Sequence, residues 1–168
     1  MGIGSNHQVN SGNRILVLGL GNPILGDDGV GWKVAEAVNA MLGPLSARVE
    51  VEFASLGGLS LMERMLGYAR AILVDSMETG RDPVGTVRVL ALADLEDPMS
   101  GHSASAHDAS LITALQAAQS MGEQVPARVD LVTIEARLSF DFTENLSAEI
   151  AAAVPIATAE VLKLLDLQ

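Results

Sequence analysis

Apolar and polar positions alternate along the chain in short segments whose periods are those of strands and helices. Residues 15–18 and 71–74 are continuous apolar runs, which predict strands that are buried on both faces. Residues 48–54 alternate between polar and apolar side chains, which predicts a half-buried strand or a strand at a sheet edge. A further strand is predicted over residues 86–91, and the alternating residues 128–136 predict the last one.

Helices are predicted between these strands, over residues 30–42, 60–68, 107–121 and 147–165. The apolar residues of the first segment follow one helical face, and Gly43-Pro44 is expected to end it. Ser60 and Glu63 have the spacing of a capping box, which predicts that the second helix opens at Ser60. Pro155 lies inside the last helix, where a proline removes a backbone hydrogen bond, so we expect a kink or a break there.

Strands separated by helices predict a three-layer α/β domain, in which a mostly parallel, twisted sheet is flanked by helices. The chain has 168 residues, a length that suits one domain. We expect residues 14–168 to form this domain and residues 1–13 to form a flexible tail.

Composition excludes several classes of protein. A hydrophobic fraction of 49% excludes a disordered chain, although 10 basic and 21 acidic side chains give a net charge of −11. A charge of this sign argues against nucleic acid and anionic membranes as partners. No apolar run approaches the roughly 18 residues of a membrane span, and the first residues lack the pattern of a signal peptide. We therefore expect a cytoplasmic protein.

The chain has no cysteine, which excludes disulfides, thiolate zinc sites, iron–sulfur clusters and a cysteine nucleophile. It has only 3 histidines, so any metal site must use mainly carboxylate oxygens. No His-Glu-x-x-His run is present, and the surroundings of Ser60 lack the second glycine of a nucleophile elbow.

The glycine-rich turn after the first strand differs from a dinucleotide-binding motif. Gly19 and Gly21 have the right spacing, but the third glycine of that motif is replaced by Ile24. Asp27 and Asp28 follow, and two carboxylates at the start of a helix would repel a phosphate. A nucleotide-dependent enzyme with the same architecture stays an alternative, which predicts measurable cofactor binding.

Three separated residues are candidates for one site, because the carboxyl ends of parallel strands lie at one edge of a sheet and ligands bind there. Asp28 follows the first predicted strand, Asp75 ends the third, and His107 opens a helix. Together they would form an open metal site of two carboxylates and one imidazole, with a free position for a substrate or water. Ordinary alternatives are a helix N-cap for Asp28, a turn residue for Asp75 and a solvated loop histidine for His107.

The segment 15–31, ILVLGLGNPILGDDGVG, resembles the N-terminal signature of the hydrogenase maturation proteases. The resemblance continues through Gly57-Gly58, the strand that leads to Asp75 and the helix start at Ser105-Ala-His107, and covers most of residues 14–165. It implies a phosphorylase/hydrolase-like α/β fold. It also implies an endopeptidase that removes a C-terminal peptide from the large-subunit precursor of a [NiFe] hydrogenase.

The resemblance also assigns roles to residues. Asp28, Asp75 and His107 match the family's nickel-recognition site, where they would bind nickel that the precursor already carries and act on the substrate through it. Asn22 and the pair Gly57-Gly58 fall in family motifs that contact the substrate. Nickel is thus expected as transiently bound cargo of the substrate, and Cd or Zn is expected to substitute for it in crystals.

One stretch departs from the family pattern. Members usually have an acid followed by Gly-Gly-Thr after the second strand, whereas this chain has Leu56-Gly57-Gly58-Leu59. The missing acid motivates an alternative function, in which the chain is a non-cleaving relative that binds the metal-loaded precursor as a checkpoint or chaperone.

Overall fold

The computed structural model describes residues 14–55, 57–96, 106–137, 139 and 141–165. Side chains are described at all of these positions except 44, 45, 95, 96 and 106–110. The predicted tail at residues 1–13 lies outside the described residues.

Five strands form one sheet in the order β2-β1-β3-β5-β4. They are β1 (Ile15–Leu20), β2 (Val49–Ala54), β3 (Arg70–Met77), β4 (Val87–Ala91) and β5 (Arg128–Glu135). All neighbours are parallel except β4, which runs antiparallel to β5 at one edge. The mostly parallel sheet is therefore confirmed, and β2 is the edge strand that its alternating pattern predicted.

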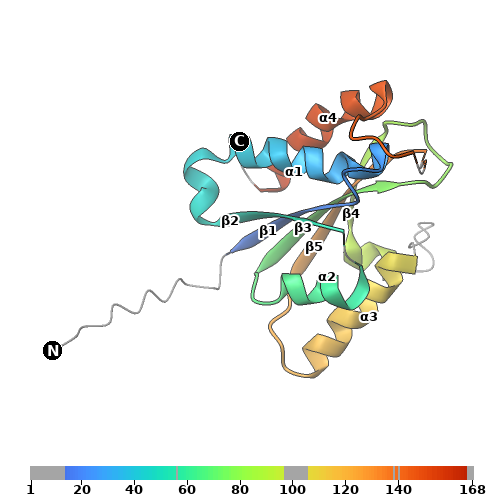
Figure 1. Ribbon diagram of the computed structural model, residues 1–168. Coiled ribbons are helices and arrows are strands. Elements are labelled where there is room, and N and C mark those ends of the chain that lie inside the picture. The colour runs from blue at the N-terminus through green and yellow to red at the C-terminus, as the bar shows by residue number, and fades with distance from the viewer. Residues whose placement is uncertain (1–13, 56, 97–105, 138, 140, 166–168) are drawn as a thin grey trace.

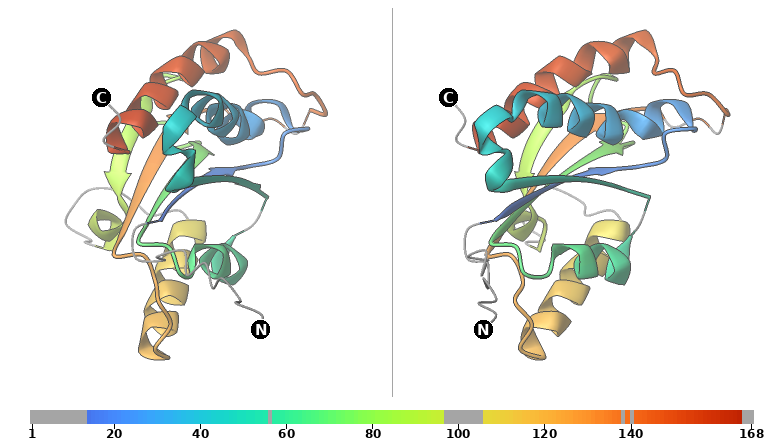
Figure 2. Two further views of the ribbon diagram at one scale, coloured as in Figure 1. Left: turned by 90° about the vertical axis from the view of Figure 1, so that its left-hand side faces the viewer. Right: turned by 60° about the vertical axis from the view of Figure 1, so that its left-hand side comes forward.

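Helices cover both faces of the sheet (Figures 1 and 2). They are α1 (Val30–Met41), α2 (Gly58–Met65), α3 (Ala106–Ser120) and α4 (Ala148–Leu164). Helices α1 and α4 pack together on one face, and α2 and α3 pack together on the other. The three layers of the predicted α/β domain are thus present.

Strand alternation divides the core between the two faces. In β3, Ala71 and Leu73 belong to the apolar cluster that includes residues of α2 and α3. Ile72 and Val74 belong to the cluster that includes residues of α1 and α4. The side chains of both clusters are almost fully buried. Strands β1 and β3 are therefore buried on both faces, which explains why they are continuous apolar runs.

The predicted start of α2 is wrong, and of the kink or break predicted at Pro155 the break does not occur. Helix α2 begins at Gly58, with Gly57 as its N-cap and no side-chain capping bond, so Ser60 and Glu63 form no capping box. Gly58 has a φ of 55°, which glycine adopts easily, and this turn starts the helix two residues early. Helix α4 continues through Pro155, which is exposed. Buried residues before and after the proline hold α4 against the sheet as one helix: Ile150, Ala153, Ala157 and Val161.

Strand β3 also extends two residues past Asp75, as far as Met77. Its last residues pair with β5, with Asp75 opposite Thr133 and Met77 opposite Glu135. Asp75 is therefore a strand residue and not the turn residue of the ordinary alternative. None of the helices in the described parts of the chain is long and apolar enough to cross a membrane.

Candidate active site

The candidate site lies where the chain direction across the sheet reverses. From β1 the chain crosses to β2 on one side, whereas from β3 it continues to β4 and β5 on the other side. The carboxyl ends of β1 and β3 therefore flank a switch point, the place where open α/β sheets bind ligands. In Figure 1 this edge is on the right, where the segments that follow β1 and β3 lie.

Asp28 lies at this switch point, in the short 3-10 helix η2 (Gly26–Gly29) between β1 and α1. Its Oδ2 accepts a hydrogen bond of 2.7 Å from the backbone N–H of Asn22. Its Oδ1 accepts a hydrogen bond of 3.3 Å from the hydroxyl of Ser76 in β3. The N-cap of α1 is Gly29, so Asp28 is not the helix cap of the ordinary alternative. Its carboxylate instead connects the β1 loop with the end of β3.

Glycines bring this loop close to the sheet. A Cβ on Gly31 would lie 2.3 Å from the carbonyl oxygen of Leu20 and 2.4 Å from that of Val74. A Cβ on Gly21, which has a φ of 111°, would lie 1.9 Å from the carbonyl oxygen of Asp28. Both distances are far below normal contact, so the close approach of helix α1 to β1 and β3 requires glycine at these positions.

Asp27 and Asp28 have different partners although they are neighbours. The Oδ1 of Asp27 accepts a hydrogen bond of 2.7 Å from the backbone N–H of Ser147, the N-cap residue of α4. The N–H of Gly26 donates to the carbonyl of Thr143 at 2.7 Å, and the N–H of Thr143 donates to the carbonyl of Ile24 at 3.0 Å. Residues 143–147 thus hold the site loop in place, and this leaves Asp28 as the acid directed toward β3.

Asp75 lies on the opposite face of the sheet from Ser76, because successive side chains of a strand alternate. That face is covered by α2 and α3, and the side chain of Asp75 is half-buried and has an interaction partner. Residues 121–127 join α3 to the start of β5, so the first turn of α3, which holds His107, lies toward the carboxyl edge of the parallel strands. The side chain of His107 itself lies outside the described residues.

The described side chains do not include three carboxylates or imidazoles grouped as a metal site. The structure brings Asp28 into contact with Ser76, the neighbour of Asp75, and does not place the imidazole of His107. The triad of Asp28, Asp75 and His107 therefore stays a prediction.

Of the residues predicted to contact the substrate, Asn22 is bonded directly to Asp28. Its backbone N–H donates to Asp28, and its side-chain Oδ1 accepts a hydrogen bond of 3.2 Å from the N–H of Ile24. Gly57 and Gly58 form the start of α2, close in sequence to Ser55, whose hydroxyl donates to the carbonyl of Gly21 at 2.7 Å. This bond links the end of β2 with the loop after β1. Leu56, where the resemblance led us to expect an acid, lies outside the described residues.

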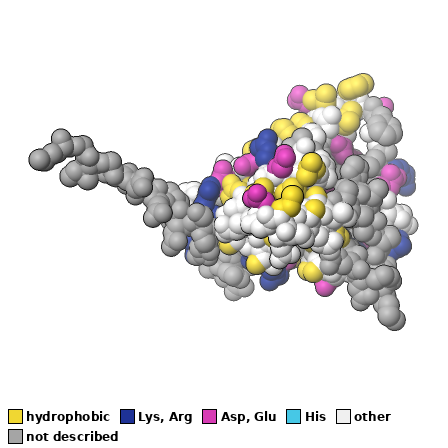
Figure 3. All heavy atoms as spheres, turned by 90° about the horizontal axis from the view of Figure 1, so that it is seen from below, with side chains coloured by type: hydrophobic (Ala, Val, Ile, Leu, Met, Phe, Trp, Pro, Cys, Tyr) yellow, Lys and Arg dark blue, Asp and Glu magenta, His cyan; other side chains and the backbone are white. Residues whose placement is uncertain are grey.

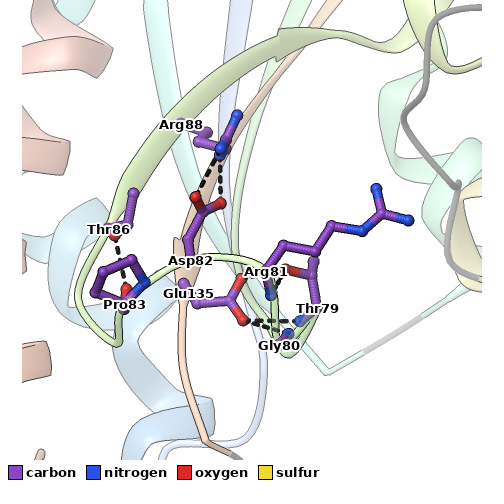
Figure 4. A network of polar contacts seen from close by, with 8 residues as sticks. All are labelled: Thr79, Gly80, Arg81, Asp82, Pro83, Thr86, Arg88 and Glu135. Carbon is purple, nitrogen blue, oxygen red and sulfur yellow. Dashed lines mark hydrogen bonds and ion pairs between the residues drawn. The ribbon is translucent and has the colours of Figure 1, made fainter.

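Residues 78–86, between β3 and β4, also lie at the carboxyl edge of the parallel strands (Figure 4). The carboxylate of Glu135, only 7% exposed, accepts hydrogen bonds from the N–H groups of Thr79 and Gly80 at 2.9 and 2.8 Å, and from the Thr79 hydroxyl at 2.7 Å. Asp82 forms two bonds of 2.6 and 2.7 Å with Arg88, and this hydrogen-bonded partner lowers the pKa of the Asp82 carboxyl. No sequence motif singles out Glu135, although its place at the end of an apolar strand is a usable clue.

The remaining acidic residues do not gather into one patch on the surface in view in Figure 3. On that face, acidic side chains are scattered among basic, apolar and uncharged ones. Several described acids form ion pairs, among them Glu52 with Arg64 and Glu160 with Lys163, each at 2.7 Å.

Comparisons with known proteins give one consistent result. A family model described as hydrogenase maturation protease matches residues 32–164. The hydrogenase expression/formation protein HupD of Rhizobium leguminosarum bv. viciae is 28% identical over 152 residues, covering 90% of this chain and 74% of that protein. The hydrogenase 2 maturation protease of Escherichia coli (strain K12) is 30% identical over 122 residues, 72% of each chain.

Solved structures of similar proteins point to the same family. The hydrogenase maturating endopeptidase HybD from E. coli superposes with a TM-score of 0.71 at 28% identity, covering 91% of this chain and 92% of that one. A hydrogenase 2 maturation peptidase from a Thaumarchaeota archaeon gives a TM-score of 0.64 at 30% identity, covering 92% and 99%. The family model spans most of the domain, and the fold agrees with solved members. The chain therefore belongs to the hydrogenase maturation protease family and is a peptidase.

Proposed function

We propose that this peptidase removes a C-terminal peptide from the large-subunit precursor of a [NiFe] hydrogenase. We further propose that it recognises the precursor through the nickel that the precursor carries. In this proposal Asp28, Asp75 and His107 bind that nickel, while Asn22 and the Gly57-Gly58 turn contact the substrate chain. Nickel is then cargo of the substrate, released with it after the cut.

The position of Asp28 carries the proposal. Its carboxylate lies at the β1/β3 switch point, held by one hydrogen bond on each oxygen, from Asn22 and Ser76. A carboxylate oxygen has two lone-pair sites, so each oxygen keeps one for a cation that arrives with the substrate. Two carboxylates and one imidazole form a set that accepts nickel and leaves positions for the precursor's own ligands.

The charge of the chain supports the same proposal. A net charge of −11 attracts a partner that presents a divalent cation and repels polyanions. The reaction itself is hydrolysis of one peptide bond. The C–N bond breaks, the hydroxyl of water joins the acyl carbon to give a carboxylic acid, and the leaving nitrogen takes up the other proton of the water.

The test compares nickel-loaded and nickel-free precursor as substrates, with mass spectrometry as the readout. We expect the wild type to shorten only the loaded precursor. Asp28→Asn, Asp75→Asn and His107→Ala should abolish the mass loss, because each would remove one metal ligand. Matched controls are Glu63→Gln on the exposed surface of α2 and Gln119→Ala near the end of α3, both expected to process normally.

Each part of the proposal has its own contradicting result. Equal cleavage of loaded and nickel-free precursor would refute recognition of the metal. Normal processing by His107→Ala would refute the ligand assignment. Stable binding of the loaded precursor without any mass loss would favour the non-cleaving alternative. In that case Leu56→Asp, which restores the family's acid, should bring cleavage back.

A further inference from the structure

Ser76 is a residue of this chain that the family resemblance does not single out. It is half-buried, and its hydroxyl donates a hydrogen bond of 3.3 Å to Oδ1 of Asp28, a residue 48 positions earlier in the chain. The other oxygen of Asp28 is held by the backbone of Asn22 at 2.7 Å. Ser76 is thus the side chain whose bond orients the second oxygen.

The extension of β3 explains how Ser76 reaches the loop. Because β3 continues to Met77, strand alternation places Ser76 on the face of Ile72 and Val74, which α1 and α4 cover. Helix η2, which holds Asp28, packs against β3 and leads into α1 on this face. Had β3 ended at Asp75, no strand geometry would have held the hydroxyl against the carboxylate.

The two hydrogen bonds differ in what they control. The Asn22 bond alone holds one oxygen, and because the Cβ–Cγ torsion is soft, a single hydrogen bond still lets the carboxylate rock. The Ser76 bond removes this freedom and sets the direction of the remaining lone pairs. Partners that orient a metal-binding group in this way typically change metal affinity or activity by about 10- to 100-fold when they are removed.

We propose that Ser76 is a positioning residue, whose hydroxyl orients the Asp28 carboxylate toward the cation that the substrate presents. The proposal rests on the proposed function of Asp28. A distance of 3.3 Å is long for a bond between two oxygens, so the expected effect of losing it is about 10-fold, the lower end of the range.

The test uses the full chain with Ser76→Ala, which removes the hydroxyl, and Ser76→Thr, which keeps it on a residue that strands favour. Ser120→Ala is the matched control, since it removes an exposed hydroxyl that only bonds the carbonyl of Gln116 within α3. Calorimetry measures binding of Cd²⁺ alone, and mass spectrometry measures the rate of processing of the nickel-loaded precursor. Thermal unfolding of each variant reports on the fold.

We expect Ser76→Ala to bind Cd²⁺ about 10-fold more weakly and to process about 10-fold more slowly, with an unchanged melting temperature. Ser76→Thr should restore both properties. Equal Cd²⁺ affinity of wild type and Ser76→Ala, or no Cd²⁺ binding by the wild type, overturns the proposal. A Ser76→Thr variant as weak as Ser76→Ala overturns it as well, because packing rather than the hydroxyl would then matter.

The binding measurement also separates this proposal from the proposed function. A wild type that binds Cd²⁺ more tightly than Asp28→Asn and Ser76→Ala do, but leaves the loaded precursor uncut, would support the positioning role and refute the processing activity. Processing that is lost in Asp28→Asn and unchanged in Ser76→Ala would do the opposite.

Discussion

Gly31 lies in the first turn of α1, where this helix crosses the ends of β1 and β3. Replacing it by alanine would place a Cβ 2.3 Å from the Leu20 carbonyl oxygen and 2.4 Å from that of Val74. An ordinary C···O contact is about 3.3 Å, so the helix would have to move by about 1 Å. Both obstructing atoms are backbone atoms of paired strands and cannot turn aside as a flexible side chain would.

The magnitude follows from two opposing effects. Overpacking costs about 1–3 kcal/mol, and the rigid backbone on both sides of Gly31 favours the upper end, about 3 kcal/mol. Alanine is the better helix former by about 1 kcal/mol, which leaves a net loss of about 2 kcal/mol in the free energy of unfolding. For a domain of this size we therefore expect Gly31→Ala to lower the melting temperature by about 4–8 °C.

The assay is thermal unfolding followed by circular dichroism, with urea unfolding as an independent measure. Lys33→Ala is the control, because it changes an exposed residue two positions further along the same helix and should shift stability by at most about 0.5 kcal/mol. A Gly31→Ala protein as stable as the wild type, or more stable, would show that helix propensity prevails and that the close approach is not rigid.

Two further predictions concern groups away from the site. Asp130 is 1% exposed and pairs with Arg70 at 2.7 Å and with Arg128 at 2.9 Å. Arg70→Met leaves this buried carboxylate with the more exposed Arg128 alone, so it should cost about 2 kcal/mol in urea unfolding, and adding Asp130→Leu should recover part of it because the under-compensated buried charge is removed. No recovery in the double variant would contradict this explanation. Burial, followed by a hydrogen bond to Glu50, raises the pKa of Tyr68 to about 12 from 10.0. Because folding raises this pKa, the neutral phenol contributes its full stability below pH 10 and loses it as the pH rises toward about 12. Tyr68 is the chain's 1 tyrosine, so its ultraviolet titration should show this midpoint directly, and Glu50→Gln should lower it; a midpoint near 10 in the folded protein would be the refuting result.

Much of the candidate site could be located from the sequence. The glycine-rich turn after a buried apolar run places Asp28 just after β1, and strand propensity places Asp75 near the end of β3. The same patterns do not indicate which of the two neighbouring acids, Asp27 or Asp28, faces the site. Asp27 bonds the backbone of Ser147, 120 positions later, and only the packing of α4 against α1 makes that partner available.

The local pattern of the chain determined the alternation of strands and helices, the burial of β1 and β3 and the absence of thiol chemistry. The first two properties follow from the types and spacing of residues close together in the chain, and the last follows from composition alone. Tertiary structure decided the strand order, the extension of β3 to Met77 and the unbroken course of α4 through Pro155. It also decided that Ser76 meets Asp28 and that Glu135 binds Thr79, because these contacts join residues at least 48 positions apart, the first through packing of η2 against β3 and the second through the β3/β5 register.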